Sequence, residues 1–319
     1  MTILETKRLD WVDVAKGITI LLMVAGHTSI PETISKYIWS FHMPLFFFVS
    51  GVFYSEKKYK TFSSLFKRRL FTLLVPYVFF SIVVMLGYYG TVYWNPKELY
   101  LGWSGYALWF IPVLFMSEML LYPFAKYIER PIIKITIIIL MLCLSKLLAL
   151  LEFHLPFKIE AVPLACSFLF MGYILKDFSK KCLLPIWLIL LSFIISIVLS
   201  QILPKTDVGR NEIGWVFPNY INAIVGVFFV MQLSRLLLSY FNLNLINRFL
   251  LWSGKNTLFI LAFSQLFNYW ILVALDMGGV KCPHIIGLLL RYVLLFLIIY
   301  VTSKVLNRYV PFMIGKNKR

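Results

Sequence analysis

The sequence predicts an all-α integral membrane protein, a single bundle of about ten transmembrane helices that takes in residues 1–319 as one domain. Hydrophobic residues make up 61% of the chain and charged residues only 14%, whereas a soluble domain carries about 25% charged residues. The 29 Phe, 18 Tyr and 9 Trp suit the aromatic belts at the two faces of a membrane. No long polar segment interrupts this pattern, so a separate soluble domain is not expected.

Apolar runs of about 17–22 residues, the length that crosses about 30 Å of hydrocarbon, recur along the whole chain. The first run is expected to remain as a span, because it contains Lys16 and lacks a small-residue cleavage site. The runs predict spans at 11–28, 37–54, 70–90, 106–126, 132–151, 161–176, 183–203, 219–239, 256–275 and 285–306.

The distribution of basic residues predicts the orientation of these spans. With an even number of spans, both termini lie on the same side of the membrane. The termini and the connections assigned to that side contain 23 of the 31 lysines and arginines. Because basic loops stay in the cytoplasm, both termini are expected there. Contact with anionic lipid headgroups then explains the net charge of +17. No loop is long enough for a basic nucleic-acid surface, so membrane lipid and not nucleic acid is the expected partner.

The first span carries a polar face. Lys16 and His27 are about three helical turns and about 16 Å apart on one side of the helix, and Asp13 lies near the same side. Ionisable residues inside an apolar span are rare without a functional reason. A neutral imidazole can take a proton from a hydroxyl or carry an acyl group. The alternative for His27 is an interfacial histidine bonded to a headgroup or a backbone carbonyl.

The second span places His42 at a depth similar to that of His27, because only a short loop joins the two spans. The two imidazoles are therefore expected to meet as catalytic groups, unless His42 is a hydrogen-bonded helix-packing residue. Pro44 and Gly51 in the same span predict a distorted helix with close backbone approach.

The third span begins with a basic cluster, Lys67, Arg68 and Arg69. Arginine forks match the oxygens of phosphate, so the cluster predicts a clamp for a phosphorylated cytoplasmic ligand. The alternative is that these residues only anchor the span on its cytoplasmic side.

Three further polar or aromatic residues are candidates for substrate binding. Glu118, near the middle of the fourth span, is expected to face the bundle interior, where pairing with Lys16 is one account of it. Trp109 is either a belt aromatic or a stacking platform. Arg291 lies about two turns into the tenth span, too deep for easy snorkelling, and is expected to face an internal cavity.

The remaining spans carry few functional signals. Asn219 and Asn222 could bond a polyhydroxylated ligand or could hold a span end. The four cysteines and four histidines show no spacing typical of metal ligands, so no metal is expected.

Several segments resemble the membrane acyltransferase-3 family, most closely its fucose 4-O-acetylase-like branch. They are WVDVAKG at 11–17 and FHMPLFFFVSG at 41–51. Ten residues separate Lys16, in the first of these segments, from His27. The basic cluster before VPY at 75–77 and the segment from LWF at 108–110 to Glu118 also agree in order and spacing. Many members have arginine where Lys16 stands, and a family segment that often ends in histidine ends here in Ser264. The similarity is specific over about residues 8–127, and the ten-span layout agrees afterwards.

The resemblance implies transfer of an acyl group, usually acetyl from acetyl-CoA as co-substrate, to hydroxyls of bacterial surface polysaccharides or lipid-linked sugars. It implies that His27 and Lys16 act at the catalytic site, that Arg68 and Arg69 bind CoA, and that the protein lies in the bacterial inner membrane. Two alternatives stay open: a transporter or flippase of a sugar with no acyl transfer, and an enzyme using succinyl or another acyl group.

Overall fold

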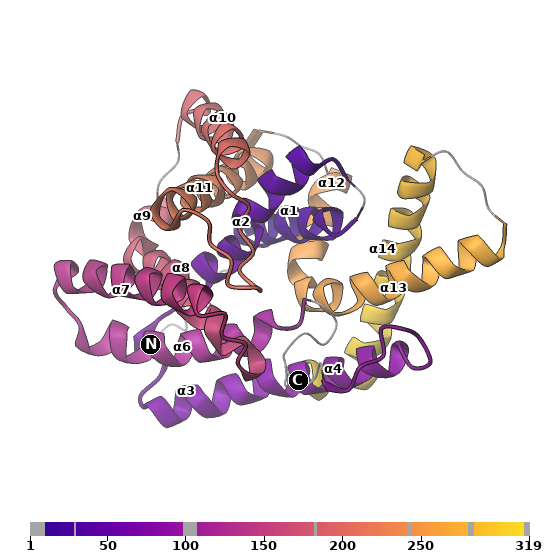
Figure 1. The fold of residues 1–319 in the computed structure, drawn as a ribbon, viewed down its shortest axis with the longest axis horizontal. Helices are drawn as coiled ribbons and strands as arrows, with labels where there is room; N and C mark the ends of the chain where they lie inside the picture. Colours follow the sequence, from indigo (N-terminus) through magenta and orange to yellow (C-terminus); the bar gives the residue numbers. More distant parts are fainter. Residues whose placement is uncertain are drawn as a thin grey trace, which may run out of the picture. The chain divides into compact units, whose positions relative to one another are not determined.

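Helices make up the regular structure of residues 10–28, 30–97, 107–181, 184–240, 244–279 and 284–315, the parts of the chain that the computed structural model describes (Figure 1). Each of the ten ranges expected to be a span contains a helix. The only strand-like pairing within these residues is an isolated antiparallel bridge between Asp207 and Glu212. The all-α prediction is therefore confirmed for the described residues.

The count of about ten spans is not confirmed. By length and composition, six helical stretches of the described chain can cross a membrane. The other four expected ranges correspond to α1 (Asp10–Gly26), α2 (Glu32–Val52), α6 (Phe110–Tyr127) and α10 (Ile186–Ile202), of which α1 and α10 have only 17 residues. The six stretches are Phe62–Gly87, Pro131–Leu150, Pro156–Ile174, Val216–Ser239, Thr257–Met277 and Ile286–Tyr309.

The chain folds as two compact units whose segments alternate along the sequence, while the expectation of a single domain stays a prediction. Unit 1 comprises Met1–Tyr54, Phe168–Val208 and Glu212–Thr257, and unit 2 comprises Ser55–Ser167, Gly209–Asn211 and Leu258–Arg319.

In unit 1, α1 and α2 pack against each other and against α11 (Val216–Tyr240). Their core contains Phe41 and Phe48 from α2 and Val227 from α11, all fully buried. The remaining helices of this unit are the second half of α8 (Val162–Ile174), α9 (Lys176–Lys181), α10 and α12 (Asn244–Lys255).

The crossing of α1 and α12 is a close backbone contact. A Cβ atom at Gly17 of α1 would overlap the carbonyl oxygen of Leu250, and one at Gly254 of α12 would overlap that of Asp13. Small residues at a helix crossing let two backbones approach closely. The two glycines therefore bring α12 against the half of α1 that carries Asp13 and Lys16.

In unit 2, a basic helix leads into an apolar one through a π-helical turn. Thr61 caps α3 (Phe62–Arg69) by accepting a hydrogen bond from the Ser64 amide, and the Ser64 hydroxyl oxygen accepts one from the Thr61 amide. The π turn η2 (Leu70–Leu74) then joins α3 to α4 (Val75–Gly87) and packs against α6. The other long helices of unit 2 are α7 (Pro131–Leu150), α13 (Thr257–Met277) and α14 (His284–Tyr309).

Candidate functional site

His27 follows directly on Gly26, the last residue of α1, and its side chain is exposed. Its Nδ1 lies 2.9 Å from the carbonyl oxygen of Met23. A carbonyl only accepts hydrogen bonds, so Nδ1 carries the proton and the Nε2 of the neutral ring is left as an acceptor. The imidazole therefore presents a basic nitrogen at an accessible end of α1.

His42 has the same local geometry in a buried setting. Its Nδ1 lies 2.9 Å from the carbonyl oxygen of Ile38, and its side chain is only 2% exposed. Because it lacks the exposure of His27, direct contact with a bulky acceptor is harder for His42. Of the two expected catalytic histidines, His27 is the accessible one.

Trp39 links the two histidines, and the sequence reasoning missed it. Its ring centroid lies 5.1 Å from that of His27 and 5.4 Å from that of His42. Trp39 stands three residues before His42 on α2, so the two side chains share a helix face. That spacing is the signal that could have identified Trp39. The structure thus brings both histidines into one aromatic cluster, with Trp39 in contact with each.

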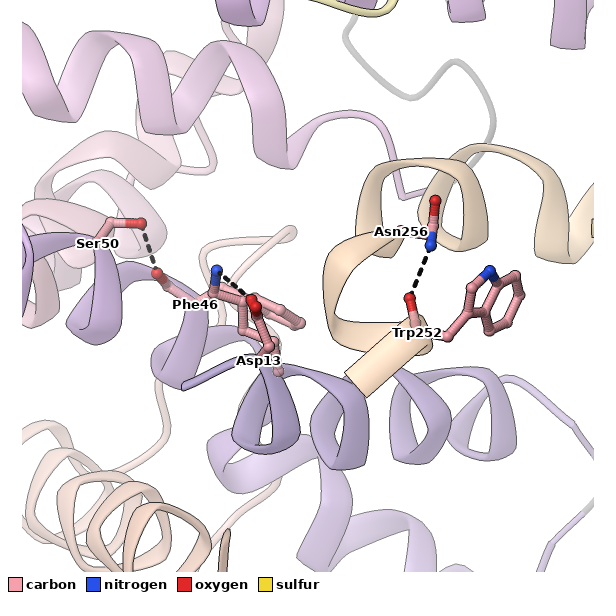
Figure 2. Close-up of polar contacts among 6 residues, drawn as sticks. Asp13, Phe46, Ser50, Trp252 and Asn256 are labelled. Atoms are coloured by element: carbon pink, nitrogen blue, oxygen red, sulfur yellow. Dashed lines mark hydrogen bonds and ion pairs between the residues drawn. The ribbon is translucent and has the colours of Figure 1, made fainter. Parts of the chain in front are cut away.

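Asp13 and Lys16 form the polar face expected on α1. Lys16 Nζ lies 3.7 Å from Asp13 Oδ1, with the carboxylate side chain 2% exposed and the lysine side chain 30% exposed. Figure 2 shows Asp13 with Phe46 and Ser50 of α2, with Trp252 of α12 and with Asn256, the residue that follows α12. Ser50 donates to the Phe46 carbonyl at 2.8 Å, and the Asn256 amide donates to the Trp252 carbonyl at 2.8 Å.

Glu118 pairs with Arg69 and not with Lys16, which corrects the pairing expected from the sequence. The ion pair joins Arg69 Nε to Glu118 Oε2, and the Glu118 side chain is 4% exposed. The π turn after Arg69 packs against α6, the helix that carries Glu118, so the two residues belong to neighbouring elements. The guanidinium group of Arg69 is therefore committed to a buried carboxylate.

Arg68 and Lys67 remain exposed at the end of α3. The Arg68 guanidinium carbon lies 5.9 Å from the centroid of the Tyr59 ring. Partial burial, followed by repulsion from Arg68 and Arg69, lowers the pKa of the neighbouring Lys58. Lys58, Arg68 and Arg69 are thus close enough to act on one another. Lys58, Lys67 and Arg68 are exposed. The arrangement can bind an anion through charge-assisted hydrogen bonds.

The two other expected substrate-binding residues lie in unit 2, away from an obvious polar partner. Trp109 is 5% exposed, and a Cβ at Gly209 would come within 2.8 Å of its ring. A buried indole does not fit the belt alternative for Trp109, and its substrate-binding role stays a prediction. Arg291 is half-buried on α14, and no carboxylate within the described ranges forms an ion pair with it.

No group of three metal-ligating side chains occurs within the described residues. Because this concerns only the described part, the absence of a metal stays a prediction.

Comparison with known proteins gives one match. The model of a family described as "Acyltransferase domain" (acyltransferase-3) matches residues 9–308. No curated protein and no solved structure matches the chain. Together with the apolar helices, this match indicates a multi-pass membrane acyltransferase. Because the match covers nearly the whole chain, from before the first expected span to the end of α14, the protein belongs to the acyltransferase-3 family.

Proposed function

We propose that this protein is a membrane O-acetyltransferase that moves acetyl from cytoplasmic acetyl-CoA to a hydroxyl of a surface polysaccharide or lipid-linked sugar. The segments that resemble the fucose 4-O-acetylase-like branch support a sugar acceptor. The distribution of basic residues supports cytoplasmic termini. The family resemblance supports a bacterial inner membrane.

The observation that carries the proposal is the state of the His27 ring. With Nδ1 bonded to the Met23 carbonyl, Nε2 is left as the acceptor nitrogen of an exposed residue. Nε2 takes the proton of the acceptor hydroxyl while that oxygen attacks the thioester carbonyl. The carbon–sulfur bond then breaks, and the CoA sulfur leaves with the proton returned by His27. An ester on the acceptor and free CoA are the products.

The other residues have supporting roles in this proposal. The exposed cations Lys58, Lys67 and Arg68 bind the phosphate groups of CoA, because each can donate charge-assisted hydrogen bonds. Lys16, whose charge is balanced by Asp13 and which lies about 16 Å along α1 from His27, is assigned to the CoA side of the site. Glu118 is assigned to holding Arg69.

The test is transfer of label from [acetyl-¹⁴C]acetyl-CoA by the purified protein in nanodiscs supplied with bacterial membrane extract. Replacing His27→Ala should lower the rate by about 10²–10⁴-fold, the usual contribution of general acid–base catalysis. His154→Ala is the control, since His154 is exposed in the turn after α7 and lies outside the histidine cluster. Retention of more than about a tenth of the wild-type rate by a well-folded His27→Ala protein would exclude the catalytic role.

The same assay separates the alternatives. Succinyl-CoA in place of acetyl-CoA tests another acyl group, and release of free CoA reports either donor. Reconstituted into sealed vesicles in place of nanodiscs, a transporter would move sugar across the membrane without releasing CoA. That result would overturn the proposed transfer reaction.

A further inference from the structure

Trp39 of α2, which was not predicted from the sequence, contacts both His27 and His42. Its indole ring is tilted by 32° to the His27 ring at a centroid distance of 5.1 Å. It meets the His42 ring edge-on, at 78° and 5.4 Å. Both distances lie in the range of about 4.5–7 Å where aromatic rings attract one another. Trp39 is therefore in contact with both imidazoles.

The polar edge of Trp39 is bonded to the end of α1. Its Nε1 donates to the Gly26 carbonyl at 3.3 Å, and Gly26 is the residue directly before His27. The His27 ring is thus restrained at three points: its own Nδ1 bond to Met23, the face of Trp39, and the backbone that Trp39 holds. These restraints leave little freedom for the direction in which Nε2 points.

A cation holds the Trp39 ring from a neighbouring loop. Lys205 Nζ lies 4.2 Å from the centroid of the Trp39 ring, well within the distance for a cation–π contact. No carboxylate within the described residues forms an ion pair with Lys205. The cation–π contact with Trp39 therefore places this ammonium group against the aromatic cluster.

The loop that carries Lys205 is itself fixed. The side-chain amide of Asn219 donates to the Pro204 carbonyl at 2.7 Å and to the Thr206 hydroxyl at 2.8 Å, on both sides of Lys205. Asn219 also accepts from the Trp215 amide at 2.9 Å. Asn219, for which the sequence leaves ligand binding open, thus anchors this loop. Lys205 reaches Trp39 from a well-defined backbone.

We propose that Trp39 is the positioning residue of His27 and that Lys205 keeps the Trp39 ring in place. This inference rests on the proposed function, because positioning matters only if Nε2 must meet an acceptor hydroxyl. A general base needs its atom within about 2.6–3.2 Å of the proton donor. A displacement of about 1 Å can cost about 100-fold in rate. Trp39 touches no reacting atom, so its effect passes through His27.

The first experiment reads the position of the imidazoles without any substrate. Diethylpyrocarbonate acylates accessible, unprotonated imidazole nitrogens, and mass spectrometry reports each of the four histidines of the chain separately. In the wild type His27 should react and His42 should not, because His27 is exposed and His42 is 2% exposed. Trp39→Ala should change the His27 rate and make His42 reactive. Trp39→Phe, which keeps a ring but loses the bond to Gly26, should give an intermediate result.

A matched control is Trp11→Ala. Trp11 is also half-buried in unit 1 and also lies under a cation, Arg235, at 4.1 Å, but it packs on Phe53 and contacts neither histidine. It should leave the reactivity of both histidines unchanged. Lys205→Ala should shift both rates in the direction of Trp39→Ala, and Lys205→Arg, which retains the cation–π contact, should restore them.

The second experiment measures CoA release with the membrane extract as acceptor source. Trp39→Ala should lower kcat by up to about 100-fold and leave KM for acetyl-CoA close to the wild-type value, since only the base is displaced. If transfer falls while the reactivity of His27 and His42 matches wild type, the positioning role is wrong. If the reactivity changes and transfer does not, His27 is not the base and the proposed function fails. A wild type that releases no CoA also refutes the proposed function, and the reactivity of the histidines still decides the role of Trp39.

Discussion

Arg68 and Arg69 are neighbours in the sequence, yet their guanidinium groups meet different surroundings. Arg69 is paired with Glu118, whose side chain is 4% exposed, while Arg68 faces solvent beside Tyr59. A charge that balances a buried carboxylate is needed for stability, whereas an exposed one is free to bind a ligand. Replacing Arg69 should therefore lower stability, whereas replacing Arg68 should weaken ligand binding.

We expect Arg69→Ala to destabilise the protein by about 3 kcal/mol, the low end for breaking a buried pair, because the Arg69 side chain is 25% exposed. Arg69→Ala/Glu118→Gln should recover much of this loss, since no unpaired buried charge remains. The midpoint of thermal unfolding in detergent is the measurement. An Arg69→Ala protein that melts like the wild type would show that the pair adds no stability.

Arg68→Ala should instead weaken acetyl-CoA binding and leave the melting midpoint unchanged. Arg68→Lys should restore only part of the affinity, because lysine keeps the charge but loses the planar fork. The apparent KM for acetyl-CoA, taken at two salt concentrations, is the measurement, since exposed charges are screened over about 8 Å at physiological ionic strength. Wild-type affinity in Arg68→Ala would mean that Arg68 only anchors the span.

Some of these residues could be found from the sequence and others could not. His27, Lys16 and Asp13 are visible because polar residues are unusual in an apolar run. Trp39 is hidden, because one more aromatic residue among the 29 Phe, 18 Tyr and 9 Trp carries no signal by itself. The pairing of Glu118 with Lys16 was wrong because Lys16 and Arg69 both match Glu118 by charge. Only the packing of η2 on α6 selects Arg69.

At the scale of elements, the contact between α1 and α12 fixes the polar part of α1. Sequence reasoning missed α12 because a 12-residue helix is too short to span a membrane and reads as a loop between two apolar runs. The same applies to α9, which has six residues. The helical segment at the third predicted span begins before that span, because the basic cluster that reads as a loop forms α3, which is capped by Thr61.

We expect Gly17→Ala and Gly254→Ala each to separate α1 from α12, because the new methyl group would overlap a backbone carbonyl that cannot move aside. Overpacking of this kind costs about 1–3 kcal/mol. Lower melting midpoints and lost transfer activity are the expected readouts. Gly26→Ala is the control on the same helix for the melting midpoint alone, since its new methyl group would meet side-chain atoms, of Ile38 at 3.2 Å and of Trp39 at 3.4 Å. Its transfer activity is not compared, because Gly26 accepts the hydrogen bond of Trp39. Equal effects of all three changes would argue against a special crossing.

At the scale of the whole molecule, each range expected to span the membrane is helical, but helix formation and membrane crossing are separate properties. Six stretches meet the length and composition needed to cross, and α1, α2, α6 and α10 do not. A short or partly polar helix can cross only with the support of its neighbours. Hydropathy therefore predicts the helices well and leaves the number of crossings to experiment.

Orientation can be measured directly. In a background without the four native cysteines, a cysteine at position 58 should stay unlabelled by an impermeant thiol reagent added to intact cells, and one at position 97 should be labelled. Both residues are exposed lysines in the structure, so accessibility to water does not bias the comparison. Labelling at position 58 from outside would reverse the orientation and remove the argument for a cytoplasmic donor at Arg68.

The contact between Gly254 and the Asp13 carbonyl has a consequence for biosynthesis. Roughly 240 residues separate the two positions, so at about 5–20 residues per second α1 waits tens of seconds in the membrane before α12 is made. During that interval Lys16 has a counter-ion within its own helix, Asp13, three residues earlier. We therefore expect nascent chains that end before residue 240 to insert α1 less efficiently when Asp13 is replaced by Asn, as measured in microsomes. The ion pair would then serve the protein before its active site exists.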